Sequence, residues 1–144
     1  MDFIELAEFD REDLLEMLDR ARVFIDDEGE IVTLGEYRHA LDGTSVGLLF
    51  FEPSTRTRVS FEYATERLGG YSLFLSEKDS SVKKGETVMD TCRDLVAMGF
   101  DGLVVRHGDR HLPFSLSDEL EVPIINAGNG TGAHPTQALL DALT

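Results

Sequence analysis

Residues 46–70, VGLLFFEPSTRTRVSFEYATERLGG, place a short apolar run directly before a stretch with helical spacing. The run over 46–51 contains only apolar or small residues, which predicts a buried strand. Pro53 cannot extend a central strand, and Ser54 is a favourable helix N-cap. The sequence therefore predicts a strand, a tight turn and then a helix over 54–68.

The turn before this helix gathers groups that bind anions. The positive end of a helix dipole and its free N–H groups favour negative charge. Three hydroxyls and two guanidiniums over 54–58 add donors at the same place. We expect an oxyanion such as phosphate to bind there. For this motif alone, a capped helix with two surface arginines is the alternative.

Helical and strand patterns alternate along most of the chain. A helix over 10–24, capped by Asp10, precedes the strand at 46–51. Further strands are expected over 72–76, 101–106 and 122–126, and further helices over 86–98, near 115–120 and over 135–143. The pattern predicts a single α/β domain over 1–144, a doubly wound, four-stranded parallel sheet with helices on both faces. The carboxyl ends of the strands then share one edge.

The charge and composition limit the partners. A formal net charge of −15 repels nucleic acid and anionic membranes, so neither is an expected partner. A phosphate site in so acidic a chain must therefore be formed by a local cluster of arginines. The N-terminus lacks a basic region typical of a secretory signal. The single cysteine, Cys92, cannot form an internal disulfide and is expected to be buried. These features favour a cytoplasmic location.

Three more polar clusters follow the later strands. Ser80 and Lys84 lie in a loop after the second strand, where a solvated loop is the alternative. Arg106 ends the third strand, where a simple salt bridge is the alternative. His134 precedes Pro135 at a helix start and Gln137 lies three residues on, although a helix cap would explain a lone histidine.

The combined set suits a substrate that is already activated. It offers an anion cradle, two or three cations, and an imidazole with an amide for a carbonyl or carboxamide. It has no Ser/His/Asp relay and no paired catalytic carboxylates. His107 and His111 are separated by Gly108, which opposes the helix that a metal pair would need, so no metal and no cofactor are expected. An acyl phosphate with an adjacent amide nitrogen fits both halves of the site.

At these residues the sequence resembles the transcarbamoylases, most closely the aspartate carbamoyltransferases. The resemblance runs from about residue 8 to 144. Four motifs carry it: 50–58, 80–86, Arg106-His107, and 126–141 with its His134-Pro-Thr-Gln137. Ornithine carbamoyltransferases share Ser54-Thr-Arg-Thr-Arg58 but usually carry His-Pro-Cys-Gln and lack the Ser-Ser-x-Lys-Lys-Gly loop. The resemblance therefore favours aspartate as co-substrate.

The resemblance also implies roles for individual residues. It assigns the phosphate of carbamoyl phosphate to Ser54, Thr55, Arg56 and Thr57. It assigns the carbonyl oxygen to Thr57, Arg106 and His134, and the carbamoyl nitrogen to Gln137. Ser80 and Lys84 would enter the site of a neighbouring subunit in a catalytic trimer. Glu52 would bridge to a second domain when that domain closes.

The chain departs from the family in length. Family members are about twice as long and carry a second domain that binds aspartate. Because the match ends at residue 144, we expect the aspartate-binding second domain to be absent from this chain. Two hypotheses follow: the carbamoyl-phosphate half of an aspartate carbamoyltransferase, inactive alone, or a non-catalytic binding or scaffold module. A fragment of an ornithine carbamoyltransferase is a third. A regulatory chain or a dihydroorotase is a partner by family analogy only.

Overall fold

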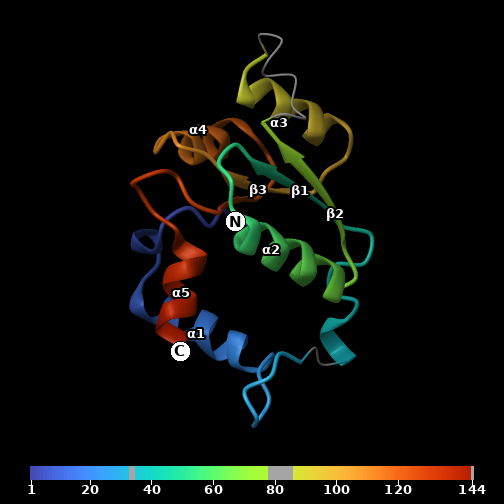
Figure 1. Cartoon of the computed structure of the whole chain (residues 1–144), viewed down its shortest axis with the longest axis vertical. Helices are drawn as coiled ribbons and strands as arrows, with labels where there is room; N and C mark the ends of the chain where they lie inside the picture. The colour runs from blue at the N-terminus through green and yellow to red at the C-terminus, as the bar shows by residue number, and fades with distance from the viewer. Residues whose placement is uncertain (33–34, 78–85, 144) are drawn as a thin grey trace.

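The computed structural model describes residues 1–32, 35–77 and 86–143. Its centre is a parallel sheet of β1 (Ser45–Phe50), β2 (Tyr71–Ser76), β3 (Gly102–Arg106) and β4 (Ile124–Asn126) in the order β2-β1-β3-β4 (Figure 1). The predicted four-stranded parallel sheet is confirmed. β4 begins two residues later than expected, because Pro123 has no N–H for the ladder and contributes only its carbonyl, to Leu103 N–H.

The helices follow the expected alternation. They are α1 (Arg11–Arg22), α2 (Thr55–Arg67), α3 (Val88–Ala97), α4 (Leu112–Glu119) and α5 (Pro135–Leu143), with short 3-10 turns at Leu6–Glu8 and Gly35–Tyr37. Asp10 caps α1 as predicted, accepting from the N–H groups of Glu12 and Asp13. α4 begins three residues before the predicted 115, because Pro113 fits the first turn of a helix.

Helices cover both faces of the sheet, as predicted. α3 and α4 pack on one face through Cys92, Leu95 and Leu116, against strand residues such as Leu49 and Val105. On the other face, Phe61 of α2 packs against a cluster of Leu48, Phe50, Val104 and Ala127. Figure 1 shows the layers, with the sheet between α2 and the pair α3 and α4.

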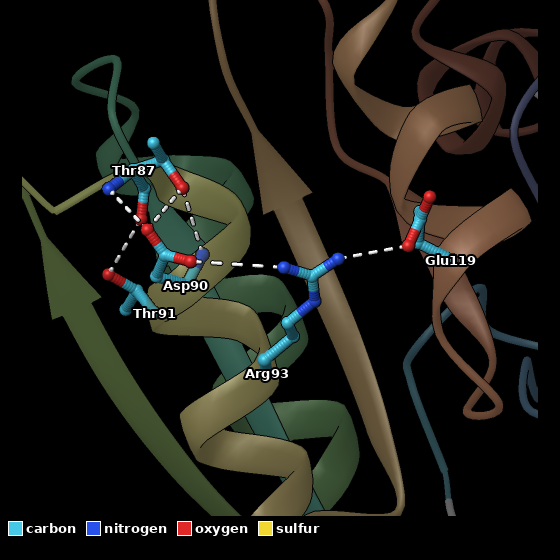
Figure 2. A network of polar contacts seen from close by, with 5 residues as sticks. All are labelled: Thr87, Asp90, Thr91, Arg93 and Glu119. Atoms are coloured by element: carbon cyan, nitrogen blue, oxygen red, sulfur yellow. Dashed lines mark hydrogen bonds and ion pairs between the residues drawn. The ribbon is translucent and has the colours of Figure 1, made fainter.

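A polar network fixes the start of α3 and ties it to α4 (Figure 2). Thr87 and Asp90 form a reciprocal capping box, in which each side chain accepts from the backbone N–H of the other. The hydrogen bonds from Thr87, and the nearby Arg93, lower the pKa of the exposed Asp90 carboxyl. Arg93 then reaches across to Glu119 at 2.9 Å. The contacts orient α3 relative to α4 at the surface.

α1 lies away from the sheet, beside α5 (Figure 1). The sequence predicts a broad apolar face on this helix, made of Leu14, Leu15, Leu18, Ala21 and Val23. Within the described part of the chain none of these residues is buried, and Leu15 and Val23 are exposed. The helix is correctly predicted, but its apolar face remains largely uncovered.

The N-terminal residues extend the sheet beyond β4. Phe3 forms a parallel bridge with Ile125, and Phe3 N–H donates to Ile124 O at 2.8 Å. The Asp2 carboxylate accepts from Ile124 N–H at 2.7 Å and from the Ser117 hydroxyl at 3.0 Å. The edge strand β4 is therefore protected by the chain's own first residues.

Cys92 is fully buried, as predicted, and burial raises the pKa of its thiol to about 12. No helix in the described ranges is both long and apolar enough to span a bilayer.

Candidate anion-binding site

A hollow of about 770 Å³, which we call the main hollow, opens between the N-terminal half of α2, the end of β3 and the start of α5. It brings together Ser54, Arg56, Thr57, Arg106, His134 and Gln137, which the sequence placed at separate motifs. The remaining lining residues are Ser60, Phe61, Ala64, Thr136 and Leu140. The hollow is polar beside the strand ends and more apolar farther along α2.

The N-terminus of α2 forms one wall. Ser54 occupies the N-cap position with extended backbone, as predicted, but its side chain does not cap the helix. Its hydroxyl instead donates to the Thr57 hydroxyl oxygen at 2.9 Å. The first backbone N–H groups of α2 therefore lack the side-chain acceptor that an N-cap serine normally supplies, and they can serve an anion.

Arg56 brings an unneutralised charge to this wall. Its side chain is exposed, and it has no carboxylate partner among the described residues. The neighbouring Arg58 differs, because its Nε donates to Glu62 at 3.0 Å and its guanidinium lies 4.0 Å from the centre of the Phe74 ring. Arg56 is thus the guanidinium of this helix that is available to a ligand in the main hollow.

Arg106 forms the opposite wall, at the end of β3. Its Nη1 donates to the Ala127 carbonyl at 2.8 Å, and its Nη2 lies 3.8 Å from a Glu52 carboxylate oxygen. Its Nε is buried without a hydrogen-bond partner. The Nη1 bond fixes the guanidinium at the wall of the hollow, while the buried, partnerless Nε costs free energy.

His134 enters the hollow directly before α5, whose first residue is Pro135, as the sequence predicts. Burial, and then the charge of Arg106, lower the pKa of the His134 imidazole below its ordinary value of 6.5. The ring is therefore neutral at pH 7. Its Nδ1 lies 3.3 Å from the Thr136 hydroxyl. A neutral imidazole can donate to a carbonyl oxygen without adding a full charge.

Gln137 lies on α5, three residues after His134, and lines the main hollow. Its amide nitrogen donates to Asp141 at 2.9 Å, which fixes the side chain and leaves the amide oxygen as an acceptor. Thr55 and Glu52 instead line a second, smaller hollow of about 310 Å³ on the β2 side of α2, and Ser54 lies between the two.

Two predicted site residues, Ser80 and Lys84, lie outside the described residues. Over the ranges that are described, no three histidine, cysteine, aspartate or glutamate side chains group as a metal site. His107, weighed above as a metal ligand, accepts the Asp109 N–H at its Nδ1 at 2.9 Å.

Several groups that support the site were not predicted from the sequence. Thr136 beside His134, the Ala127 carbonyl that binds Arg106, and the close approach of Gly128 to Arg106 were not identified. A signal for the last two exists in the sequence, since an asparagine at a strand end followed by Ala-Gly indicates a tight backbone turn. For Thr136 no comparable signal exists.

The arrangement offers two kinds of recognition within one hollow. Free N–H groups, hydroxyls and Arg56 suit a dianionic phosphate. Arg106 and a neutral His134 suit a polarised carbonyl oxygen, and an amide oxygen suits an N–H donor. No nucleophile activated by a base is present among these lining residues, so the chemistry that fits is transfer from an activated acyl group.

Comparisons with known proteins give a consistent result. A family model described as "Aspartate/ornithine carbamoyltransferase, carbamoyl-P binding domain" matches residues 1–144. The aspartate carbamoyltransferase catalytic subunit of Stenotrophomonas maltophilia is 48% identical over 136 residues, which cover 93% of this chain and 42% of that protein. The corresponding subunit of Aliarcobacter butzleri is 45% identical over 141 residues, covering 98% and 45%.

Solved structures agree with the sequence matches. Aspartate transcarbamoylase from Trypanosoma cruzi, in complex with carbamoyl phosphate and aspartate, superposes with a TM-score of 0.82 at 37% identity, covering 99% of this chain and 45% of that one. Ornithine carbamoyltransferase from Pyrococcus furiosus gives 0.82 at 33% identity, covering 99% and 44%. The chain thus spans under half the length of these relatives.

Proposed function

The chain belongs to the aspartate/ornithine carbamoyltransferase family, as its carbamoyl-phosphate-binding domain, and from this membership we propose that the main hollow binds carbamoyl phosphate for transfer to aspartate. The observation that carries the proposal is the convergence of Arg56, Thr57, Arg106 and His134 on one hollow. Three separate sequence motifs supply a phosphate wall and a carbonyl wall that face the same space.

The phosphate is proposed to bind at the N-terminus of α2. Ser54, Thr55 and Thr57 would donate from backbone or hydroxyl groups, and Arg56 would pair with the phosphate oxygens. Thr55 can contribute through its backbone at the helix start, because its side chain lines the smaller hollow. The absence of a side-chain cap on α2 supports this assignment.

The carbamoyl group is proposed to lie between β3 and α5. Arg106, Thr57 and His134 would donate to the carbonyl oxygen, and the Gln137 amide oxygen would accept from the carbamoyl nitrogen. When the amine attacks, negative charge develops on that oxygen. Donors that are already in place stabilise the tetrahedral intermediate more than the substrate. Phosphate then leaves from the α2 side.

The co-substrate is proposed to be the aspartate amine, giving N-carbamoyl-aspartate and phosphate, a step of pyrimidine biosynthesis. The names of the catalytic-subunit relatives support aspartate. The ornithine carbamoyltransferase match at 33% identity makes ornithine the competing co-substrate. Comparing aspartate with ornithine in an assay of a longer protein that contains this domain distinguishes them.

The assembly is proposed to be a homotrimer in which Ser80 and Lys84 serve a neighbouring site. Mixing Lys84→Ala and Arg56→Ala subunits of such a longer protein should restore part of the activity. In the mixed trimers, some sites combine the intact Arg56 of one subunit with the intact Lys84 of its neighbour. A failure to complement would mean that the loop serves its own subunit. The cytoplasmic location expected from the sequence, a regulatory chain and a dihydroorotase partner remain predictions.

Calorimetric titration of this chain with carbamoyl phosphate, and with a bisubstrate phosphonate, tests the binding proposal. We expect saturable binding that Arg56→Ala weakens by about 2–3 kcal/mol, as for a charge-assisted bond. Arg93→Ala is the matched control, since it removes the same charge from a guanidinium paired with Glu119 on the other face. Binding that is absent, or equal in both variants, would refute the proposal.

A further inference from the structure

Two asparagines beside the site are completely buried. Asn126 ends β4 and Asn129 lies in the loop that leads to α5, and both have 0% exposure. Neither side chain lines the main hollow. Burying an amide is costly unless its donors and acceptor are all paired, so their hydrogen bonds define what they hold in place.

Asn129 closes the loop onto its own end. Its Oδ1 accepts from Ala133 N–H at 2.5 Å, and its backbone N–H donates to Ala133 O at 3.2 Å. Its Nδ2 donates to Arg110 O at 2.8 Å, across to the segment that follows β3. Both peptide groups of Ala133, the residue before His134, are therefore held by one asparagine.

Asn126 holds the same point from the opposite side. Its Nδ2 donates to Ala133 O at 3.3 Å and to Ile4 O at 3.0 Å, and its Oδ1 accepts from Gly128 N–H at 2.8 Å. The two amides thus converge on Ala133 from within the protein. The position at which α5 begins, and with it His134, depends on this convergence.

The same loop also holds Arg106. Its Nη1 bonds Ala127 O, and the next carbonyl, of Gly128, accepts from His107 N–H at 3.1 Å. Gly128 lies so close that an added Cβ would collide with the Arg106 guanidinium and lie 3.4 Å from the His134 ring. A shift of this loop would therefore move both carbonyl-side groups together.

We propose that Asn126 and Asn129 are positioning residues, which set His134 and Arg106 against the α2 wall through Ala133 and Ala127. They contribute no atom to the ligand. Their effect on transfer rests on the proposed function, whereas their effect on the geometry of His134 does not. Errors of about 1 Å in such a site reduce rates strongly, which gives buried supporting amides a functional importance.

Asn129→Ala removes the clamp, and Gly132→Ala disturbs it without deleting a buried polar group. A Cβ on the exposed Gly132 would collide with Asn129 Oδ1. Thr91→Ala is the control for lost stability, because it removes a buried hydroxyl on α3, remote from the loop. The readouts are NMR titration of the His134 imidazole, assigned with His134→Gln, and the affinity for inorganic phosphate.

In both loop variants we expect the pKa of His134 to rise toward 6.5, since water reaches the ring and Arg106 withdraws, while Asp141 stays on the same helix. Phosphate affinity should fall about tenfold. Thr91→Ala should change neither. If folded Asn129→Ala and Gly132→Ala both retain the wild-type His134 titration and bind phosphate within twofold of wild type, the asparagines only support packing and the proposal fails. If the wild type binds no phosphate but the His134 titration still shifts, the proposed function fails and the positioning role stands.

Discussion

Arg106, at the end of β3, lies beside Glu52, which follows β1, with Nη2 and Oε2 3.8 Å apart, while the same guanidinium donates to Ala127 O. Glu52 is also near Gly108, where an added Cβ would lie 3.2 Å from its carboxylate. The Glu52 carboxylate therefore lies where it would repel an anionic ligand of Arg106. The protein thus places a competing negative charge beside Arg106.

Glu52→Gln should strengthen phosphate binding to this chain. The pair is partly exposed and long, so removing the carboxylate is expected to change the binding free energy by about 0.2–1 kcal/mol, or at most about fivefold in affinity. Glu119→Gln makes the same change in net charge on the α4 surface and should leave affinity unchanged. Weaker phosphate binding in Glu52→Gln would show that the carboxylate assists the site.

Ser54→Ala should mainly weaken phosphate binding, whereas Asp10→Ala should mainly lower the free energy of unfolding. Asp10 caps α1 through two backbone N–H groups, so its loss should reduce the free energy of unfolding by about 1 kcal/mol in urea. Ser54 makes no such cap, so Ser54→Ala should cost less in stability but weaken phosphate binding. Equal destabilisation by both substitutions would contradict this description of α2.

Phosphate should raise the pKa of His134. Burial and Arg106 depress it, and an anion bound at the α2 wall of the same hollow stabilises the imidazolium. By linkage, the native state binds fewer protons at this group than the unfolded state. The stability it contributes is complete above about pH 6.5 and is lost as pH falls through the native pKa. NMR titration with and without saturating phosphate measures the shift, and the His39 resonances provide a remote reference. No shift, or a downward one, would place phosphate outside the main hollow.

Gly128→Ala should weaken phosphate binding, because it displaces a positive charge of the same hollow, whereas Gly99→Ala should only destabilise the fold. Both glycines have positive φ, 116° and 96°, so either alanine costs about 1–2 kcal/mol of backbone strain. Only at Gly128 does the new Cβ meet Arg106, since Gly99 has open space around it. Denaturation and phosphate titration of the two variants separate strain from collision. Normal binding by Gly128→Ala would refute the close packing of loop and guanidinium.

The Cys92 thiol should resist modification in the native protein. With a pKa of about 12, only about one thiol in ten thousand is ionised at pH 8, and the group is also fully buried. An aromatic disulfide reagent should react within seconds with Met98→Cys, whose position is 75% exposed, but with wild type only after urea is added. Rapid reaction of native wild type would indicate local opening of α3.

The sequence predicts those elements and site residues whose positions depend on short patterns of neighbouring residues. The apolar run over 46–51 and Pro53 define β1 and the start of α2. Because the carboxyl ends of parallel strands share one edge of the sheet, Arg106 and His134 are predicted to lie where α2 begins. The sequence does not predict how the Ser54 hydroxyl turns, because both a backbone N–H and Thr57 are within reach of it. It does not predict the loop over 127–133, whose shape depends on Asn126 and Asn129 bonding groups brought near by the fold.

The hydrogen bond from the Ile124 N–H to the Asp2 carboxylate joins groups 122 positions apart in the chain. During synthesis, residues 2–4 must therefore wait for nearly all of this domain before their partners emerge. The Ile4 carbonyl that Asn126 binds belongs to this same late-docking segment. Nascent chains that stop before residue 124 cannot close the β4 edge, so they should depend on chaperones until β4 has left the exit tunnel.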